Sequence, residues 1–305
     1  MPLTTDVFLV SYPDHYAGLP ALFRSIEKFV IGFRRVVLVI EEADPAPDVL
    51  AFVEIKRCRN YRDYHACNYW GRGGQQIEKL RAWHYTDAER VIYVDSDLVF
   101  VRPVDVQTDP CISLEKPLVI WRMWKDAGEA RKWYLPTKMV LRFEPPGECM
   151  ARFPFVFPRW FLQEYWRYMG EITNSDEWLQ VFAHPQEFNG LGNYAMARHA
   201  DKFTLLRVGV DALPETCIYQ YSIPKRTPAD VAELERLGLL PKIPTLEDAK
   251  EFLRQGKAPW GVVESCRVCG ANAHFVLFDF VDPLGALISL AWARDTGEWA
   301  SARMP

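Results

Sequence analysis

The sequence has no long uninterrupted hydrophobic run, and this absence limits where the protein can reside. No apolar stretch of about 18 residues occurs in the 305-residue chain, so we expect no membrane-spanning helix. The start of the chain also lacks a basic segment followed by an apolar core, so we expect no secretory signal peptide. These absences together predict a cytoplasmic protein.

Glycine-rich phosphate loops are also missing. The turns that follow the first two apolar runs, at Ser11-Tyr12 and at Glu41, contain no glycine motif of the P-loop or dinucleotide-binding type. Nucleotide binding through either of those two motifs is therefore not expected.

Cysteines are few, and their spacing does not indicate a set of disulfide bonds. The seven cysteines are odd in number and scattered, as is typical of reduced thiols in a cytoplasm. Cys266 and Cys269 form a single C-x-x-C pair, and no second pair is present to complete a zinc site. Cys217 and His274 are the residues that could complete one, but we do not expect zinc.

Positive charge is not in excess either. The net charge of -4 excludes a protein whose whole surface binds nucleic acid. One segment, Arg57–Gly74, does interleave arginines (57, 59, 62 and 72) with tyrosines and a tryptophan. Such a segment can hold phosphates and stack bases or sugars, or it can be a surface loop with arginines stacked on its own rings. DNA is therefore a possible partner through Arg57–Arg72, although not the favoured one.

Apolar and aromatic residues are abundant. Hydrophobic residues make up 49% of the chain and aromatic residues 14%, which is ample material for a folded core. Asp6–Ser11 and Arg35–Ile40 are continuous apolar runs, and Leu22, Phe23, Ile26, Phe29 and Val30 between them follow a helical period. This order predicts a βαβ unit in a parallel sheet that is covered on both faces.

The remaining elements predict an α/β fold with a mixed, mostly parallel sheet flanked by helices. Further strands are expected at Val53–Lys56, Leu118–Trp121 and Ala273–Phe280, and further helices at Gln75–Tyr85, Trp160–Met169, 174–182, Asp230–Leu240, Leu246–Gln255 and Leu284–Arg294. We expect residues 1–213 to form the main domain. Residues 214–305 would form a largely helical extension packed on that same domain.

The chain is organised around Arg90–Pro103. Val91–Val94 is an apolar run typical of a buried strand, and it stops at Asp95-Ser96-Asp97. Two carboxylates at the end of a buried strand are costly unless a cation, a basic side chain or water neutralises them. Ligands bind at the carboxyl ends of strands in open α/β sheets, and paired aspartates suit Mg²⁺ or Mn²⁺. The alternative is a turn in which Asp97 caps the next segment.

Asp95-Ser96-Asp97 matches two known patterns. It resembles the DxD motif of GT-A glycosyltransferases, which holds a divalent ion against the diphosphate of a nucleotide-sugar. It also resembles the motif of HAD phosphatases, in which Asp95 would be the nucleophile. The HAD motif follows the first strand of its fold, whereas a βαβ unit precedes Asp95 here, and we find no downstream Gly-Asp-x-x-x-Asp. Position therefore favours the first resemblance.

The resemblance is most specific at 75–103. A helix with Gln-Gln-x-x-Lys precedes the Asp-Ser-Asp strand end, as in a poorly characterised bacterial and phage group of GT-A glycosyltransferases. The similarity continues more loosely at Pro154–Trp160 and at Glu187–Tyr194, and covers about residues 1–200. It implies a GT-A-like fold with Rossmann-like topology.

The resemblance implies a role for several residues. Asp97 would bind the metal directly, and Asp95 would hold the ribose or a metal-bound water. Gln76 and Lys79 would face the donor, where Lys79 could neutralise a phosphate. From strand position alone, we also expect Ser11, Tyr12 and Glu41 to line the edge where base and ribose lie.

The candidate residues for the acceptor side of the site lie mostly after Asp97 in the sequence. Glu187 is the candidate general base or β-face carboxylate, with Asp176 as the second choice; a Glu that only caps a helix is the alternative. His274 is a candidate third metal ligand, although a lone His on an apolar run is more often buried and hydrogen-bonded. Tryptophans near Trp121 and Trp133 would wall an acceptor site or simply pack.

These expectations describe a metal-dependent glycosyltransferase that uses Mn²⁺ or Mg²⁺ and a nucleoside-diphosphate sugar, with a UDP-sugar favoured. The acceptor would be a glycan or polysaccharide precursor, or a modified DNA base. Two alternatives stay open at this point: a HAD-type phosphotransferase that uses Asp95 as its nucleophile, and an inactive carbohydrate-binding relative.

Overall fold

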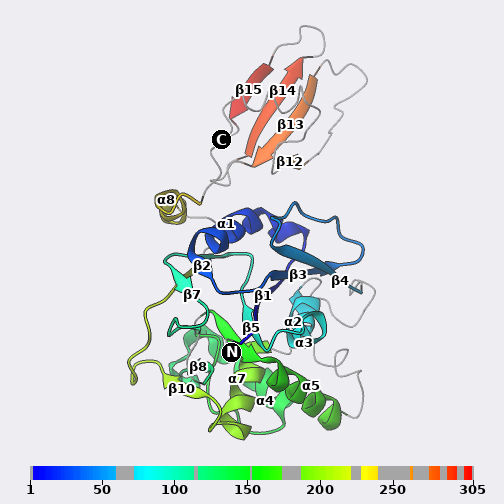
Figure 1. Ribbon diagram of the computed structural model, residues 1–305. Helices are drawn as coiled ribbons and strands as arrows, with labels where there is room; N and C mark the ends of the chain where they lie inside the picture. The colour runs from blue at the N-terminus through cyan, green and yellow to red at the C-terminus, as the bar shows by residue number, and fades with distance from the viewer. Residues whose placement is uncertain are drawn as a thin grey trace. The chain divides into compact units, whose positions relative to one another are not determined.

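The structure is a computed structural model, and its chain divides into two units, Met1–Gln220 and Tyr221–Pro305. The residues that it describes are 3–59, 72–112, 116–151, 153–173, 187–220 and 228–239, followed by the strand residues 262–263, 275–281, 287–293 and 299–303. Figure 1 shows the helices and strands of both units.

The first unit is built on a five-stranded sheet. Its strands, in spatial order, are β4 (Val53–Cys58), β3 (Val36–Glu41), β1 (Thr5–Val10), β5 (Arg90–Tyr93) and β9 (Phe155–Pro158). The first four strands are parallel, and β9 runs antiparallel beside β5. The predicted α/β fold with a mixed, mostly parallel sheet is therefore confirmed.

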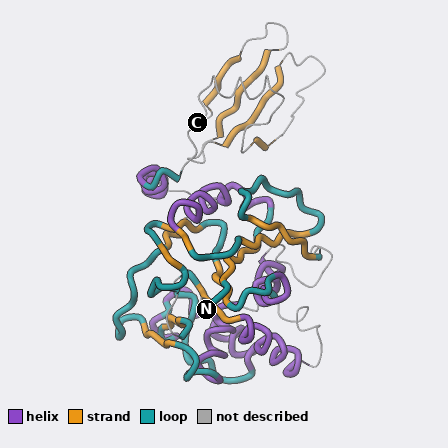
Figure 2. The backbone as a smooth tube through the Cα atoms, in the orientation of Figure 1, coloured by secondary structure: helices purple, strands orange, loops and turns teal. Residues whose placement is uncertain are grey.

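Both faces of this sheet are covered, as the continuous apolar runs predict. Alternate residues of β1 enter opposite cores: Val7 and Leu9 pack on one side, and Phe8 and Val10 on the other. Helix α1 (Leu19–Phe29) fills the first core. The second core is filled by α2 (Arg72–Leu80), α3 (Ala82–Tyr85), α5 (Arg159–Thr173) and α7 (Glu187–Arg198). Figure 2 shows these helices flanking the strands.

Smaller elements surround the sheet. They are η1 (Pro13–Gly18), β2 (Val30–Ile31) paired with β7 (Val104–Asp105), β6 (Leu98–Phe100) paired with β11 (Ile218–Gln220), β8 (Leu118–Trp121) paired with β10 (Thr204–Arg207), η3 (Trp124–Asp126), η4 (Gly128–Trp133) and α4 (Tyr134–Leu141). The pairing of β11 with β6 keeps the chain in the first unit as far as Gln220. The division therefore falls after Gln220, and not at 213.

The second unit differs from its expectation. Helix α8 (Pro228–Arg236) agrees with the helix expected at Asp230–Leu240, and the one expected at Leu246–Gln255 lies outside the described residues. The helix predicted at Leu284–Arg294 is wrong, because Leu287–Ala293 is strand β14. It pairs antiparallel with β13 (Phe275–Val281) and β15 (Trp299–Arg303), and β12 (Val262–Val263) completes the sheet. A short apolar run has the same composition in a buried helix and in a strand.

No helix in the described part of the chain is both long and apolar enough to cross a bilayer.

The strand order locates one special point at the edge of the main sheet. The chain passes from β1 outward to β3 and β4, then returns to the other side of β1 as β5. The order reverses between β1 and β5, and ligands of open α/β sheets bind outside the carboxyl ends of strands at such a switch point.

Candidate functional site

The segments that follow β1 and β5 bring Ser11 and Asp95 to this switch point. Sheet pairing continues just beyond each strand: Ser11 N donates to Val39 O at 3.0 Å, and Val94 N donates to Phe8 O at 3.1 Å. The chain then turns at Asp95-Ser96-Asp97, where Leu98 N donates to Asp95 O at 3.2 Å, and re-enters a strand as β6. Asp95 and Asp97 are therefore held in a tight turn at the ligand-binding edge.

Lys79 lies between two carboxylates that are far apart in the sequence. Its Nζ atom is 3.0 Å from Glu187 Oε1 and 2.7 Å from Asp95 Oδ1. The contact with Glu187 is an aligned hydrogen bond, whereas the contact with Asp95 is a charge contact. The three predicted site residues therefore meet in one cluster, which we call the Lys79 triad.

The triad is removed from water. The side chains of Lys79 and Glu187 are 3% and 4% exposed, and that of Asp95 is 22% exposed. Burial lowers the pKa of the Lys79 ammonium, but the charges of Asp95 and Glu187 outweigh it, and the net pKa is raised. Lys79 is therefore a buried cation that contacts two of the protein's own acids. Its predicted role in neutralising a donor phosphate stays a prediction.

The surroundings of the triad fix its geometry. Tyr93 OH donates to the Lys79 carbonyl at 3.0 Å, which ties α2 to β5. The Lys79 ammonium also lies 5.1 Å from the centroid of the Phe188 ring. Glu187 begins α7, so the predicted helix start is confirmed, but its carboxylate pairs with Lys79. Its second oxygen, Oε2, is buried and has no hydrogen-bond partner among the described residues.

Asp97 has a weaker set of neighbours. Its Oδ2 atom accepts a hydrogen bond from Gln220 Nε2 at 3.3 Å. Burial, and then the charge of Asp95, raise the pKa of Asp97 to about 6. Lys79 lowers it only slightly, so this corner holds more negative than positive charge.

The two glutamines of α2 differ in their roles. Gln75 Nε2 donates to the Val10 carbonyl at 3.1 Å and anchors α2 to the end of β1. Gln76 Oε1 and Ser11 Oγ are buried, and neither atom has a hydrogen-bond partner in the part of the chain that the structure describes. Buried polar atoms are nearly always satisfied, and an exception calls for an explanation such as a missing ligand or water.

His15 is a neighbour of the site that the sequence analysis missed. It lies in η1, where its Nε2 atom is 2.7 Å from Tyr12 OH and its Nδ1 atom is 3.4 Å from Ser96 Oγ. The Tyr12 and His15 rings also stack, with centroids 4.2 Å apart. The order Tyr-Pro-Asp-His directly after β1 was the available signal, since a His so close to a strand end falls at the ligand-binding edge.

The Glu187–Tyr194 motif is explained mainly by packing. Asn189 Oδ1 accepts from Cys149 N at 2.7 Å, and Asn193 Oδ1 accepts from Gly147 N at 3.0 Å. A Cβ added at Gly192 would lie 2.5 Å from Cys149 Cβ, so only glycine fits there. These residues pin the segment 147–149 onto α7 and thereby hold Glu187 in place.

Other predicted residues make contacts away from the Lys79 triad or lie outside the described residues. Glu41 ends β3 on the same edge, and the backbone carbonyl of Glu41 accepts from Arg57 Nη1 at 3.0 Å. Trp124 donates to the Pro145 carbonyl at 2.9 Å, which supports a packing role for it. The residues Asp176, His274, Arg62, Cys266 and Cys269 lie outside the described residues.

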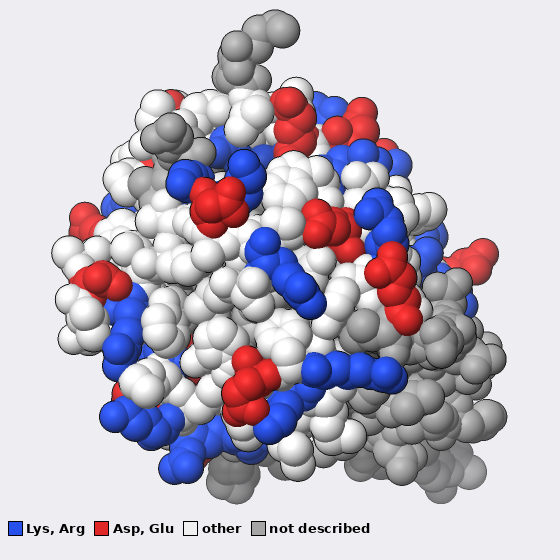
Figure 3. Space-filling view, turned by 90° about the horizontal axis from the view of Figure 1, so that it is seen from below, with Lys and Arg blue, Asp and Glu red and all other residues white. Residues whose placement is uncertain are grey.

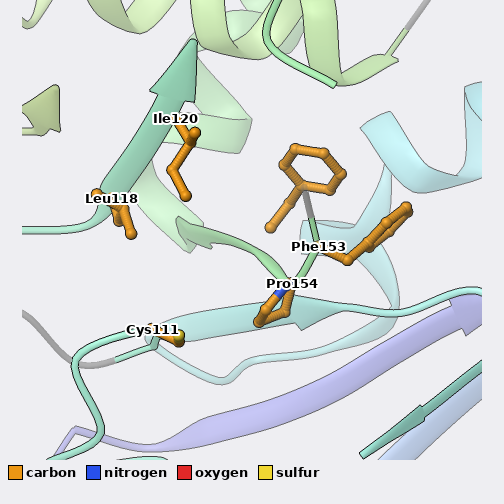
Figure 4. A pocket seen from close by; sticks show the side chains of 6 residues that line it. Cys111, Leu118, Ile120, Phe153 and Pro154 are labelled. Carbon is orange, nitrogen blue, oxygen red and sulfur yellow. The ribbon is translucent and has the colours of Figure 1, made fainter. Parts of the chain in front are cut away.

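An apolar pocket borders the site. Its lining residues are Cys111, Leu118, Ile120, Phe153, Pro154 and Phe155, and Figure 4 shows Leu118 and Ile120 of β8 across from Phe153 and Pro154. Phe155 stacks on Phe188, with centroids 3.9 Å apart, so this wall adjoins the Lys79 triad.

Asp95 and Asp97 are the two predicted metal ligands that lie within the described residues. Within the described residues, no group of three or more His, Cys, Asp or Glu side chains has the geometry of a metal site. Asp95 and Asp97 do fit a hard cation such as Mg²⁺ or Mn²⁺, which often takes one or two carboxylates and completes its shell with water and phosphate.

No protein-family model matches this chain, and no curated protein is similar to it.

Proposed function

We propose that this protein is a metal-dependent glycosyltransferase that takes a sugar from a nucleoside-diphosphate sugar. The observation that carries the proposal is the position of Asp95 and Asp97 at the switch point between β1 and β5. The sequence resemblance of 75–103 to GT-A glycosyltransferases points in the same direction. A GT-A-like fold is part of this proposal.

The charge balance of the corner supports binding of a cation with a diphosphate. Asp95, Asp97 and Glu187 are three carboxylates, and Lys79 is their nearby ammonium. A divalent ion at Asp97 would offset the remaining negative charge and create a site for an anionic ligand. When bound, such an ion stabilises the negative charge that develops on a leaving diphosphate.

The protein's own residues would divide the remaining tasks. Ser11 Oγ, just after β1, and Gln76 Oε1, within α2, have no hydrogen-bond partner among the described residues and would be available to donor hydroxyls. Lys79 holds Asp95 and Glu187 in fixed positions. Glu187 Oε2 is the candidate to accept a proton from the acceptor hydroxyl, with Asp176 as the second choice.

A thermal-shift panel tests this proposal. The purified full chain is melted with UDP, GDP, CMP or TDP, each with and without Mn²⁺. One nucleotide, with UDP favoured, should raise the melting temperature by a few degrees, and only in the presence of metal. A ligand at about a hundred times its Kd adds about 2.7 kcal/mol to the free energy of unfolding. Asp97→Asn should abolish this shift. Asp201→Asn, which changes a carboxylate with 74% side-chain exposure, should not.

Three results would argue against the proposal. The first is no shift with any nucleotide, and the second is an equal shift without metal. The third is stabilisation by beryllofluoride and Mg²⁺ in the absence of nucleotide that is lost in Asp95→Asn. That pattern would identify Asp95 as a phosphoryl acceptor, and the protein as a phosphotransferase.

A further inference from the structure

The segment Arg131–Arg142 has an unusual composition for the surface of an acidic protein. It reads RKWYLPTKMVLR and contains four basic residues and no carboxylate, whereas the whole chain carries a net charge of -4. The segment forms the end of η4 and all of α4. It therefore combines positive charge with apolar and aromatic side chains on one short element.

Helix α4 uses its two sides differently. Thr137, Val140 and Leu141 are buried against the core of the first unit. Leu135 and Met139 are 59% and 56% exposed. Because they are four residues apart, they lie on the same side of the helix. The outward side of α4 thus presents two large apolar side chains to solvent.

Basic and aromatic side chains flank this apolar pair. Lys132 Nζ lies 5.2 Å from the centroid of the Trp133 ring, and Lys138 Nζ lies 5.8 Å from that of Tyr134. Both rings are half-buried. Trp and Tyr favour the boundary between apolar and wet surroundings, and Lys can keep its ammonium in water while its stem covers apolar surface.

The charge near α4 remains positive after its ion pairs are considered. Lys138 pairs with Glu144 at 2.6 Å. Arg131, Lys132 and Arg142 are exposed cations for which no carboxylate contact is recorded within the described residues. Figure 3 views the side of the first unit on which α4, α5 and α7 lie in Figure 1, and there Lys, Arg, Asp and Glu side chains are scattered over largely uncharged surface.

We propose that the outward side of Arg131–Arg142, called the α4 surface below, docks reversibly on an anionic lipid bilayer. A helix that presents Leu and aromatic side chains beside Lys and Arg is typical of peripheral membrane binding. Leu135 and Met139 would enter the boundary between headgroups and acyl chains, while the cations contact anionic headgroups. A nucleic acid would satisfy the cations but leave the apolar pair in water. The proposal is independent of the proposed enzymatic function.

Vesicle flotation tests the α4 surface. The full chain is mixed with vesicles of phosphatidylcholine alone, or of phosphatidylcholine with phosphatidylglycerol. It should float with the anionic vesicles at low salt and be released at high salt, because the Debye length shrinks to about 3 Å near 1 M salt. Leu135→Ser/Met139→Ser should weaken vesicle binding at least about tenfold, since each lost apolar side chain removes buried area. Lys132→Gln should weaken it less.

Matched controls keep the test specific. Ile31→Ser removes another exposed apolar side chain, 65% exposed, from β2 and should leave vesicle binding unchanged. Circular dichroism melts should show that all variants fold like the wild type.

Three results would overturn the proposal. They are no binding to anionic vesicles, equal binding by the double variant, and an effect of Ile31→Ser as large as that of the double variant. A dimer in light scattering that Leu135→Ser/Met139→Ser abolishes, without any vesicle binding, would assign the α4 surface to a second copy of the chain instead.

Discussion

The two ends of the central sheet both bury acids and hydroxyls, but they satisfy them to different degrees. At the amino end, Asp6 of β1 is fully buried and accepts hydrogen bonds from Arg34 at 2.8 and 2.9 Å, from Arg35 at 3.2 Å and from Thr86 Oγ1 at 2.5 Å. Both oxygens of its carboxylate are therefore engaged by the protein itself.

The carboxyl end has orphaned polar atoms instead. Ser11 Oγ, Gln76 Oε1 and Glu187 Oε2 are buried there, and the described residues offer them no hydrogen-bond partner. Asp97 has one long bond from an amide, and a raised pKa. The comparison teaches that burial of an acid does not by itself indicate a ligand site. Incomplete satisfaction of several neighbouring polar groups is the more informative signal.

The largest expected loss of stability follows from changing Lys79, the cation that neutralises two acids at the carboxyl end of the sheet. Lys79→Met leaves Asp95 and Glu187 facing each other in a buried site without their cation, so we expect a loss of about 3–5 kcal/mol in the free energy of unfolding. Urea denaturation measures it. Lys138→Met, in an exposed pair with Glu144, should change stability very little.

A double variant sharpens this result. Lys79→Met/Glu187→Gln should be more stable than Lys79→Met alone, because one of the two stranded charges is gone. If Lys79→Met behaves like Lys138→Met, the Lys79 triad does not hold the carboxyl end together.

A smaller loss is expected at the amino end. Asp6→Asn should cost about 2–3 kcal/mol, because Arg34 and Arg35 lose a buried charged acceptor while remaining partly hydrated. Its matched control is Asp87→Asn, which removes an exposed partner of the same Arg34, at 2.6 Å, and should cost little. The response to nucleotide and Mn²⁺ should be unchanged in Asp6→Asn. If Asp6→Asn lost the response to nucleotide and Mn²⁺, the amino and carboxyl ends of the sheet would not differ in function.

The smallest expected effect is a gain of stability, and it follows from changing Asp97. In the folded protein the pKa of Asp97 is raised to about 6, so the native state binds a proton there more tightly than the unfolded chain does. Stability should therefore fall as the pH rises from about 4 to about 6, and stay reduced above that range. Asp97→Asn should remove this part of the pH dependence and raise metal-free stability at pH 7.5 by about 1–2 kcal/mol, after allowance for screening.

Urea titrations from pH 4 to pH 8 in the presence of a chelator measure this change. Destabilisation of Asp97→Asn at pH 7.5 would show that the carboxylate is satisfied, like that of Asp6.

Much of the main sheet was predictable because its strands are continuous apolar runs. Thr5–Val10, Val36–Glu41 and Arg90–Tyr93 occur where the runs predict them, and Leu118–Trp121 has the predicted bounds. The antiparallel strand Phe155–Pro158 was not predicted as a strand, since four residues ending in proline give little periodic signal.

The sequence predicted which residues belong to the candidate site better than it predicted which of them contact each other. The strand end at Asp95, and the resemblance to GT-A glycosyltransferases for Lys79 and Glu187, predict these three as site residues, but they do not predict that an ammonium will lie between two acids. That arrangement depends on how α7 packs against α2, which local sequence does not encode. Gln220 was missed because a lone glutamine in a short strand carries no motif.

The long span between the partners in the Lys79 triad has a consequence for the newly made chain. Lys79 and Glu187 are 108 residues apart, and Asp97 and Gln220 are 123 apart. During synthesis, Lys79 and Asp95 therefore leave the ribosome well before Glu187 exists. Because contacts between distant residues form only after the long intervening segment closes, this corner should be among the late parts of the first unit to assemble.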